Sequence, residues 1–168
     1  MGKNFPLESD HKLLSLISAF LKVENSSMET KLTEICVLLK QEIKTYDWVG
    51  FYFSNHETKT LHLIAFAGIP TDHTTIPFGK GICGQVAVSN KNFVVDDVSA
   101  QENYIACNIN VKSEIVIPIL VNNSNIGQID IDSNTANAFT QKDVLFLEQL
   151  NHLLGSYIFS NNISININ

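Results

Sequence analysis

Apolar residues recur at helical spacing in three segments of the chain. Residues 9–23 and 28–44 carry leucine and isoleucine at every third or fourth position, which is the pattern of an amphipathic helix. Residues 141–159 repeat this pattern, and the Thr140–Asp143 spacing ahead of them is typical of a capping box. Cys36 falls within the apolar stripe of the second helix, so we interpret it as a small core residue with little chemistry.

Short apolar or alternating runs predict strands in the rest of the chain. They are bounded by segments rich in asparagine, glycine and proline, which favour turns. We expect five strands, at residues 47–54, 60–67, 92–95, 114–121 and 126–132. Two helices followed by strands, a short helix, more strands and a last helix predict one α+β domain with an antiparallel sheet.

A glycine-rich segment, Gly79–Gly84, leads into a short predicted helix at residues 82–89. It formally matches the G-x-G-x-x-G pattern of dinucleotide sites, but no hydrophobic parallel strand precedes it. We therefore interpret it as a glycine turn that places Cys83 in the first turn of the helix. The positive end of a helix favours a thiolate, so Cys83 is either a reactive thiol or a packed residue, and the pattern leaves both open.

Two of the predicted strands carry aromatic or acidic residues on one face. Trp48 and Tyr52 flank Gly50 in the first strand, and Asp130 alternates with Asp132 in the last. If these faces coincide, a tryptophan beside two acids indicates a ligand pocket. The plainer alternatives are a second helical layer over the aromatic face and a solvated sheet face for the acids.

Cys107 lies in a segment without a clear period, seven positions before Glu114. We expect the cysteine on a loop and the glutamate at the start of a buried strand. A thiol and a carboxyl placed in this way can combine nucleophilic and proton-transfer chemistry. Spacing alone favours the plainer interpretation, in which Cys107 fills a small gap and Glu114 is a solvated strand end.

Length and charge narrow the functional classes. The chain has 168 residues and a net charge of −6, which fits one soluble domain and argues against nucleic acid or an anionic membrane as the partner. The N-terminus is charged and shows no secretory pattern, and the number of cysteines, three, is odd. Both features favour free thiols in a reducing compartment over disulfides, so we expect a cytoplasmic protein. We expect an N-terminal extension at residues 1–8, one domain at 9–160 and a frayed tail at 161–168.

Five motifs follow one another along the chain: Asp47-Trp-Val-Gly-Phe-Tyr52, Ile76-Pro-Phe-Gly-Lys-Gly-Ile-Cys-Gly84, Tyr104-Ile-Ala-Cys107, Ser113-Glu-Ile-Val-Ile-Pro118 and Gly127-Gln-Ile-Asp-Ile-Asp-Ser133. Together they resemble the free methionine-R-sulfoxide reductases, which are small stand-alone enzymes of the GAF fold. The resemblance covers roughly residues 8–155. It implies a GAF-like fold, with helices packed on one face of a central antiparallel sheet and a ligand pocket on the other.

The resemblance also implies a mechanism. Cys107 would be the thiolate that attacks the sulfoxide sulfur, and Glu114 would hold or protonate the sulfoxide oxygen. The resulting sulfenic acid would form a disulfide with a second thiol, and a thioredoxin-type protein would reduce that disulfide. Members commonly carry a resolving cysteine where this chain has His73, which leaves Cys83 as the motif-matched partner. We expect Cys107 beside the carboxyls and Cys83 in the first turn of a helix.

The substrate-binding residues that the resemblance implies are Trp48, Tyr52, Glu114, Asp130 and Asp132. The aromatic rings would enclose the methyl group and side chain of free methionine sulfoxide, and the aspartates would engage its amino group. Clustered carboxylates would also raise the pKa of the proton donor. No metal or cofactor is expected, and the oligomeric state, a homodimer included, stays open. The alternative is a non-catalytic GAF domain that binds or senses a small molecule, as most GAF domains do.

Overall fold

The computed structural model describes residues 8–102, 104 and 108–167. Its helices are α1 (Glu8–Leu21), α2 (Met28–Glu42), α3 (Gly81–Ser89), the 3-10 helix η1 (Val98–Ala100) and α4 (Gln141–Ser160). Its strands are β1 (Trp48–Asn55), β2 (Thr60–Ala67), β3 (Thr75–Pro77), β4 (Phe93–Val95), β5 (Ser113–Val121) and β6 (Ser124–Ser133). Each predicted helix and strand is present, with bounds that differ from the prediction by at most about two residues.

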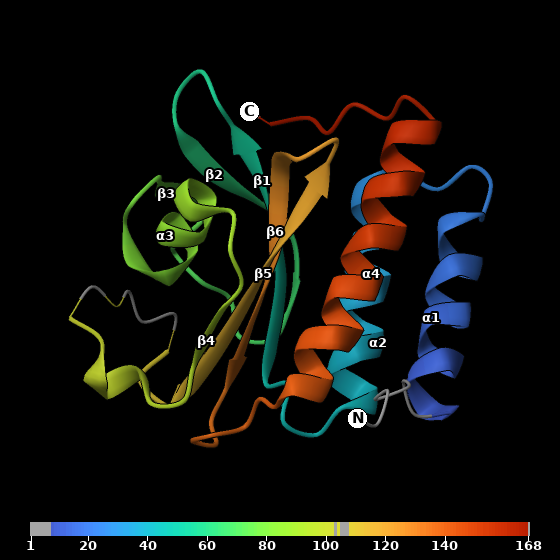
Figure 1. Ribbon diagram of the computed structural model, residues 1–168. Coiled ribbons are helices and arrows are strands. Elements are labelled where there is room, and N and C mark those ends of the chain that lie inside the picture. The colour runs from blue at the N-terminus through green and yellow to red at the C-terminus, as the bar shows by residue number, and fades with distance from the viewer. Residues whose placement is uncertain (1–7, 103, 105–107, 168) are drawn as a thin grey trace, which may run out of the picture.

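The strands form a single sheet in the order β3-β2-β1-β6-β5-β4 (Figure 1). All neighbouring strands are antiparallel, so the predicted α+β class is confirmed. The sequence pattern did not predict β3, because a three-residue strand with only Ile76 buried is too short to show a period. β3 pairs with Thr60–His62 of β2 and extends the sheet at that edge.

One face of the sheet is covered by α1, α2 and α4 (Figure 1). α2 and α4 pack directly on the strands, and α1 packs against these two helices. Ser27 caps α2 by accepting a hydrogen bond from the Thr30 amide, and the predicted capping box of Thr140 and Asp143 starts α4. The core between these layers, here called the helical-face core, includes Ile17, Leu32, Ile35, Cys36, Leu39, Phe51, Ile117, Ile129 and Leu150.

The opposite face of the sheet carries α3 (Figure 1). A second apolar cluster joins α3 to the sheet, and its members include Trp48, Tyr52, Leu61, Ile76, Ile82, Val86 and Val116. Gly84 allows α3 to approach closely, because a Cβ there would lie 2.6 Å from the carbonyl oxygen of Pro77. A helix over the aromatic face, one of the alternatives left open by the sequence, is therefore present.

The ends of the described chain add little to the site. None of the helices formed by the described residues is long and apolar enough to cross a membrane. After α4 the chain has no regular structure, but Ile163, Ile165 and Ile167 pack against the helical-face core. The domain limits expected from the sequence stay a prediction.

Candidate active site

Strand register brings three carboxyl groups together on the face covered by α3. Asp132 of β6 lies opposite Trp48 of β1 on one side and opposite Glu114 of β5 on the other. Asp130, two residues earlier on β6, lies opposite Gly50 and therefore points to the same face. All three acids are at most 5% exposed. The acids do not form a solvated sheet face, because α3 and its apolar cluster cover them.

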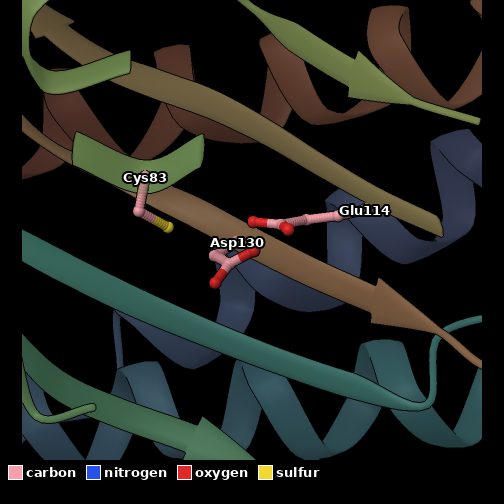
Figure 2. A group of neighbouring side chains, drawn as sticks. All are labelled: Cys83, Glu114 and Asp130. Carbon is pink, nitrogen blue, oxygen red and sulfur yellow. The ribbon is translucent and has the colours of Figure 1, made fainter. Parts of the chain in front are cut away.

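Cys83 of α3, the helix that covers this face of the sheet, lies close to two of these carboxyls, Glu114 and Asp130. It lies in the first turn of α3, as predicted, and is buried. Its Sγ and one carboxylate oxygen each of Glu114 and Asp130 lie within 4.8 Å of one another, and the three side chains point toward a common centre (Figure 2). The Cys83 thiol donates a hydrogen bond to Asp130. The family resemblance predicts Cys107 beside the carboxyls and does not predict that Cys83 contacts them.

Burial raises the pKa values of both carboxyls, and nearby negative charges raise that of Glu114 further. Burial is the largest cause for Glu114, followed by the nearby charges of Asp130 and Asp132, and together they raise its pKa well above the ordinary value. Burial raises the pKa of Asp130 to about 6, although hydrogen bonds from Cys83 and Glu114 oppose that rise. The Glu114 carboxyl therefore favours its protonated form and donates a hydrogen bond to Asp130.

The Trp48 indole ring lies over Gly50, on the strand next to Asp132. Its Nε1 donates a hydrogen bond to the Ile69 carbonyl oxygen at 3.0 Å, and the ring stacks on Phe66 with centroids 5.9 Å apart. Gly50 makes room for the ring, because a Cβ at that position would collide with it. Gly50, which lies between two aromatic residues in sequence, therefore leaves the space that the Trp48 ring occupies.

Tyr52 holds the neighbouring loop. Its ring is fully buried, and its hydroxyl donates a hydrogen bond to the His73 carbonyl oxygen at 2.8 Å. The same loop leads into β3 and then α3. Tyr52 therefore supports the wall of the site, whereas Trp48 flanks it directly.

The predicted site residues line two separate small cavities rather than one. One, about 30 Å³, is lined by residues that include Trp48, Asp132 and Asn108. The other, about 10 Å³, is lined by residues that include Glu114, Asp130, Cys83 and His73. Each volume is about that of one or two water molecules, so a larger ligand must displace the surrounding side chains.

Two residues near the first cavity were not assigned a role by the sequence analysis. A carboxylate oxygen of Asp47 accepts a hydrogen bond from the Asn134 amide at 2.7 Å, and both residues line the cavity. Asp47 opens the first of the five motifs, and this position was the only signal that could have identified it. Cys107 lies outside the described residues, but Asn108, its neighbour in sequence, lines the cavity that holds Trp48 and Asp132.

Comparisons with known proteins agree with the resemblance in the sequence. The family model of the GAF domain matches residues 25–158. The chain is 36% identical over 133 residues to the free methionine-R-sulfoxide reductase of Escherichia coli, covering 79% of this chain and 78% of that protein. It is 34% identical over 142 residues to Protein YtsP of Bacillus subtilis, covering 84% of this chain and 86% of that protein.

A solved structure gives the same result. The free methionine-R-sulfoxide reductase of Neisseria meningitidis, in complex with its substrate, superposes with a TM-score of 0.84 at 31% identity. The match covers 91% of this chain and 90% of that chain. The predicted GAF-like fold is thereby confirmed. The chain belongs to the GAF domain family and, within it, to the free methionine-R-sulfoxide reductase family.

Proposed function

We propose that this protein reduces free L-methionine-(R)-S-oxide to methionine. The relatives from Escherichia coli and Neisseria meningitidis support this reaction class through their names. The observation that carries the proposal is the buried pair of Glu114 and Asp130. Reduction of a sulfoxide needs a nucleophilic sulfur and a proton for the oxygen, and this pair keeps a proton in an apolar environment.

Glu114 is the proton donor in this scheme. Its raised pKa favours the protonated carboxyl, which is the form that can donate a proton during the attack. Asp130 accepts its hydrogen bond in the resting protein and so keeps the proton oriented. When the sulfoxide oxygen replaces Asp130 as the acceptor, the proton moves to that oxygen as the sulfur is attacked.

Cys107 is the nucleophile, an assignment that rests on its sequence motif because the residue lies outside the described residues. Its thiolate attacks the sulfoxide sulfur, and Glu114 protonates the oxygen. The oxygen then passes to the Cys107 sulfur, which becomes a sulfenic acid, while the methionine sulfur is reduced and leaves as the thioether. One thiolate, one proton and one sulfoxide give one sulfenic acid and one methionine.

Asp132 and Trp48 bind the remaining parts of the substrate. The buried Asp132 carboxylate is suited to the substrate ammonium group, because a buried anion is best stabilised by an opposite charge. The flat face of Trp48 offers an apolar surface to the methyl group and side chain. An ammonium site deep in the fold favours a free amino acid over methionine sulfoxide within a peptide.

A second thiol and an external reductant complete the cycle. Cys83 attacks the Cys107 sulfenic sulfur, forms a disulfide and releases the oxygen as water. A thioredoxin-type dithiol then reduces that disulfide by exchange and becomes oxidised itself. Cys83 fits the role of resolving thiol because it lies beside Asp130, which can take up its proton.

A single-turnover assay tests the proposal. Reduced protein mixed with the R epimer and no reductant should form one equivalent of methionine and lose two of its three thiols. The S epimer and a peptide containing methionine sulfoxide serve as matched substrates and should give no burst. Absence of a burst with the R epimer would contradict the proposed activity.

His73 favours one alternative function. It stands where the sequence resemblance expects a resolving cysteine, so this chain has one thiol fewer for the cycle. A GAF domain with this pocket but without turnover would bind or sense a small molecule. Saturable binding of free methionine sulfoxide, measured by calorimetry, together with no methionine burst would establish that alternative.

A further inference from the structure

We propose that Cys83, Glu114 and Asp130 form a binding site for a thiophilic divalent cation, with Zn²⁺ as the representative ion. The sulfur of Cys83 and one oxygen from each carboxylate lie within 4.8 Å of one another. The three side chains come from α3, β5 and β6 and converge on one point (Figure 2). They are separated widely in sequence, so no metal-binding spacing is visible in the chain.

The donor set selects the kind of cation. Cation binding releases the protons of the Cys83 thiol and of Glu114 to solvent, because the ligands must be deprotonated. The resulting thiolate and two carboxylates suit Zn²⁺ and its spectroscopic substitutes Co²⁺ and Cd²⁺, whereas Mg²⁺ and Ca²⁺ prefer oxygen ligands alone. At typical Zn–S and Zn–O bond lengths, donors around a tetrahedral ion lie about 3.5 Å apart. The donors, which lie within 4.8 Å of one another, therefore need to close by no more than about an ångström. Three protein ligands leave one position for water or for a fourth donor.

A buried carboxylate oxygen without a hydrogen-bond partner provides independent support for the cation site. Asp130 is 1% exposed, and its Oδ1 has no hydrogen-bond partner among the described residues. Neither Glu114 nor Asp130 forms a salt bridge within the described part of the chain. A buried carboxylate oxygen without a partner is costly, and a bound cation would satisfy it. Among the described residues, no lysine, arginine or histidine side chain forms an ion pair with either carboxylate.

The backbone around the site holds the donors in place. Gln128 Nε2 donates a hydrogen bond to the Cys83 carbonyl oxygen at 3.2 Å, which links the first turn of α3 to β6. The close contact of Gly84 with Pro77 fixes the same turn against β3. Glu114 and Asp130 lie on neighbouring central strands. A site built from such fixed elements binds a cation with little reorganisation.

Cation binding would have a functional consequence that rests on the proposed reductase activity. A bound ion would hold the sulfur of Cys83 and the carboxylate of Glu114. The first would then be unable to resolve the sulfenic acid, and the second could not donate a proton. Zn²⁺ would therefore inhibit sulfoxide reduction, and a chelator would restore it.

Cobalt titration tests the site directly. Adding Co²⁺ to the reduced, chelator-treated protein should produce a sulfur-to-cobalt charge-transfer band and tetrahedral d–d bands at one equivalent, and Zn²⁺ should displace them. Cys83→Ser should remove the charge-transfer band, and Asp130→Asn should weaken binding by at least about 100-fold. Cys36→Ser and Asp96→Asn are matched controls, because Cys36 lies in the helical-face core and Asp96 is exposed. Both controls should bind as the unmodified protein does.

X-ray absorption of the Zn²⁺-loaded protein provides a test that needs no variant. It should show one sulfur at about 2.3 Å and oxygen or nitrogen ligands at about 2.0–2.2 Å. No saturable binding, only oxygen ligands, or a charge-transfer band lost in Cys107→Ser but kept in Cys83→Ser would each overturn the proposal. These readouts do not depend on turnover, so loss of the reductase hypothesis would leave them intact.

Discussion

The two faces of the sheet bury their cysteines in opposite surroundings. On the helical face, Cys36 lies fully buried among leucine and isoleucine side chains. Burial raises the pKa of its thiol well above the ordinary range, so it stays protonated and unreactive. On the α3 face, Cys83 is also buried, but it lies against the carboxyls of Glu114 and Asp130. A cysteine therefore fills space in the core on one face, whereas on the other face it lies in contact with ionisable groups.

This difference shows how the domain divides stability from chemistry. The helical-face core is built mainly from aliphatic and aromatic side chains, and their burial contributes hydrophobic stabilisation. The α3 face buries carboxyl groups, and burial of ionisable groups opposes folding. Substitutions on the two faces should therefore differ in kind: changes in the helical-face core should alter stability alone, whereas changes to the α3-face acids should alter activity and the pH dependence of stability.

The largest effect is expected from the proton donor. Glu114→Gln keeps the shape of the side chain but removes the acidic proton, so kcat for sulfoxide reduction should fall by about 10²–10⁴-fold with little change in substrate affinity. Steady-state kinetics with calorimetric binding measures both quantities. A Glu114→Gln variant with nearly unmodified kcat would refute the assignment of this residue.

The two buried thiols give the next contrast. Cys83→Ser should form one equivalent of methionine and then stall with thioredoxin, because the sulfenic acid of Cys107 has no partner thiol. Cys36→Ser should turn over as the unmodified protein does. Burst and steady-state assays measure both. Full multiple turnover of Cys83→Ser with thioredoxin would remove Cys83 from the recycling scheme.

Shortening a core side chain on the helical face should lower stability and leave activity unchanged, which is the opposite of the effect expected for Glu114→Gln. Ile129→Ala removes a fully buried side chain and should lower the free energy of unfolding by about 2–5 kcal/mol. Ile109→Ala is the exposed control, since that side chain is 95% exposed, and should stay within about 0.5 kcal/mol. Chemical denaturation gives both values. The residual folded Ile129→Ala protein should keep its kcat, because the side chain points away from the site.

The buried acid of the α3 face should make stability depend on pH. The pKa of Asp130 is about 6 when folded, against 3.8 ordinarily, so the folded state holds more protons between these values. Stability should therefore fall as pH rises through this window, by on the order of 3 kcal/mol. Asp130→Asn should reduce this dependence, and the slope that remains should come from Glu114, whose pKa is also raised. Denaturation midpoints measured from pH 4 to 7 with chelator present test the sign, and a rise with pH would contradict it.

The smallest effect concerns a helix cap on the helical face. Thr140→Ala removes one half of the capping box at the start of α4 and should cost about 1 kcal/mol of stability. Activity should not change, because α4 lies on the side of the sheet opposite the carboxyls. Thermal denaturation and a turnover assay on the same sample check both parts.

Much of the fold could be predicted because its signals are local. Period-2 alternation placed Asp130 and Asp132 on one face of β6 and Ile129 and Ile131 on the other, and the register agrees. The capping box of α4 was visible as a three-residue spacing. β3 was missed because three residues with one buried side chain provide no period.

The sequence by itself determined the elements, their inward faces and the presence of acids on a strand face, because these properties depend on neighbours along the chain. Only the tertiary structure decided that β6 lies between β1 and β5, which sets Asp132 between Trp48 and Glu114. It also brought Cys83 against Asp130, 47 positions later in the chain. Such contacts, and the raised pKa values that follow from them, depend on burial between distant segments, and no local spacing encodes that burial.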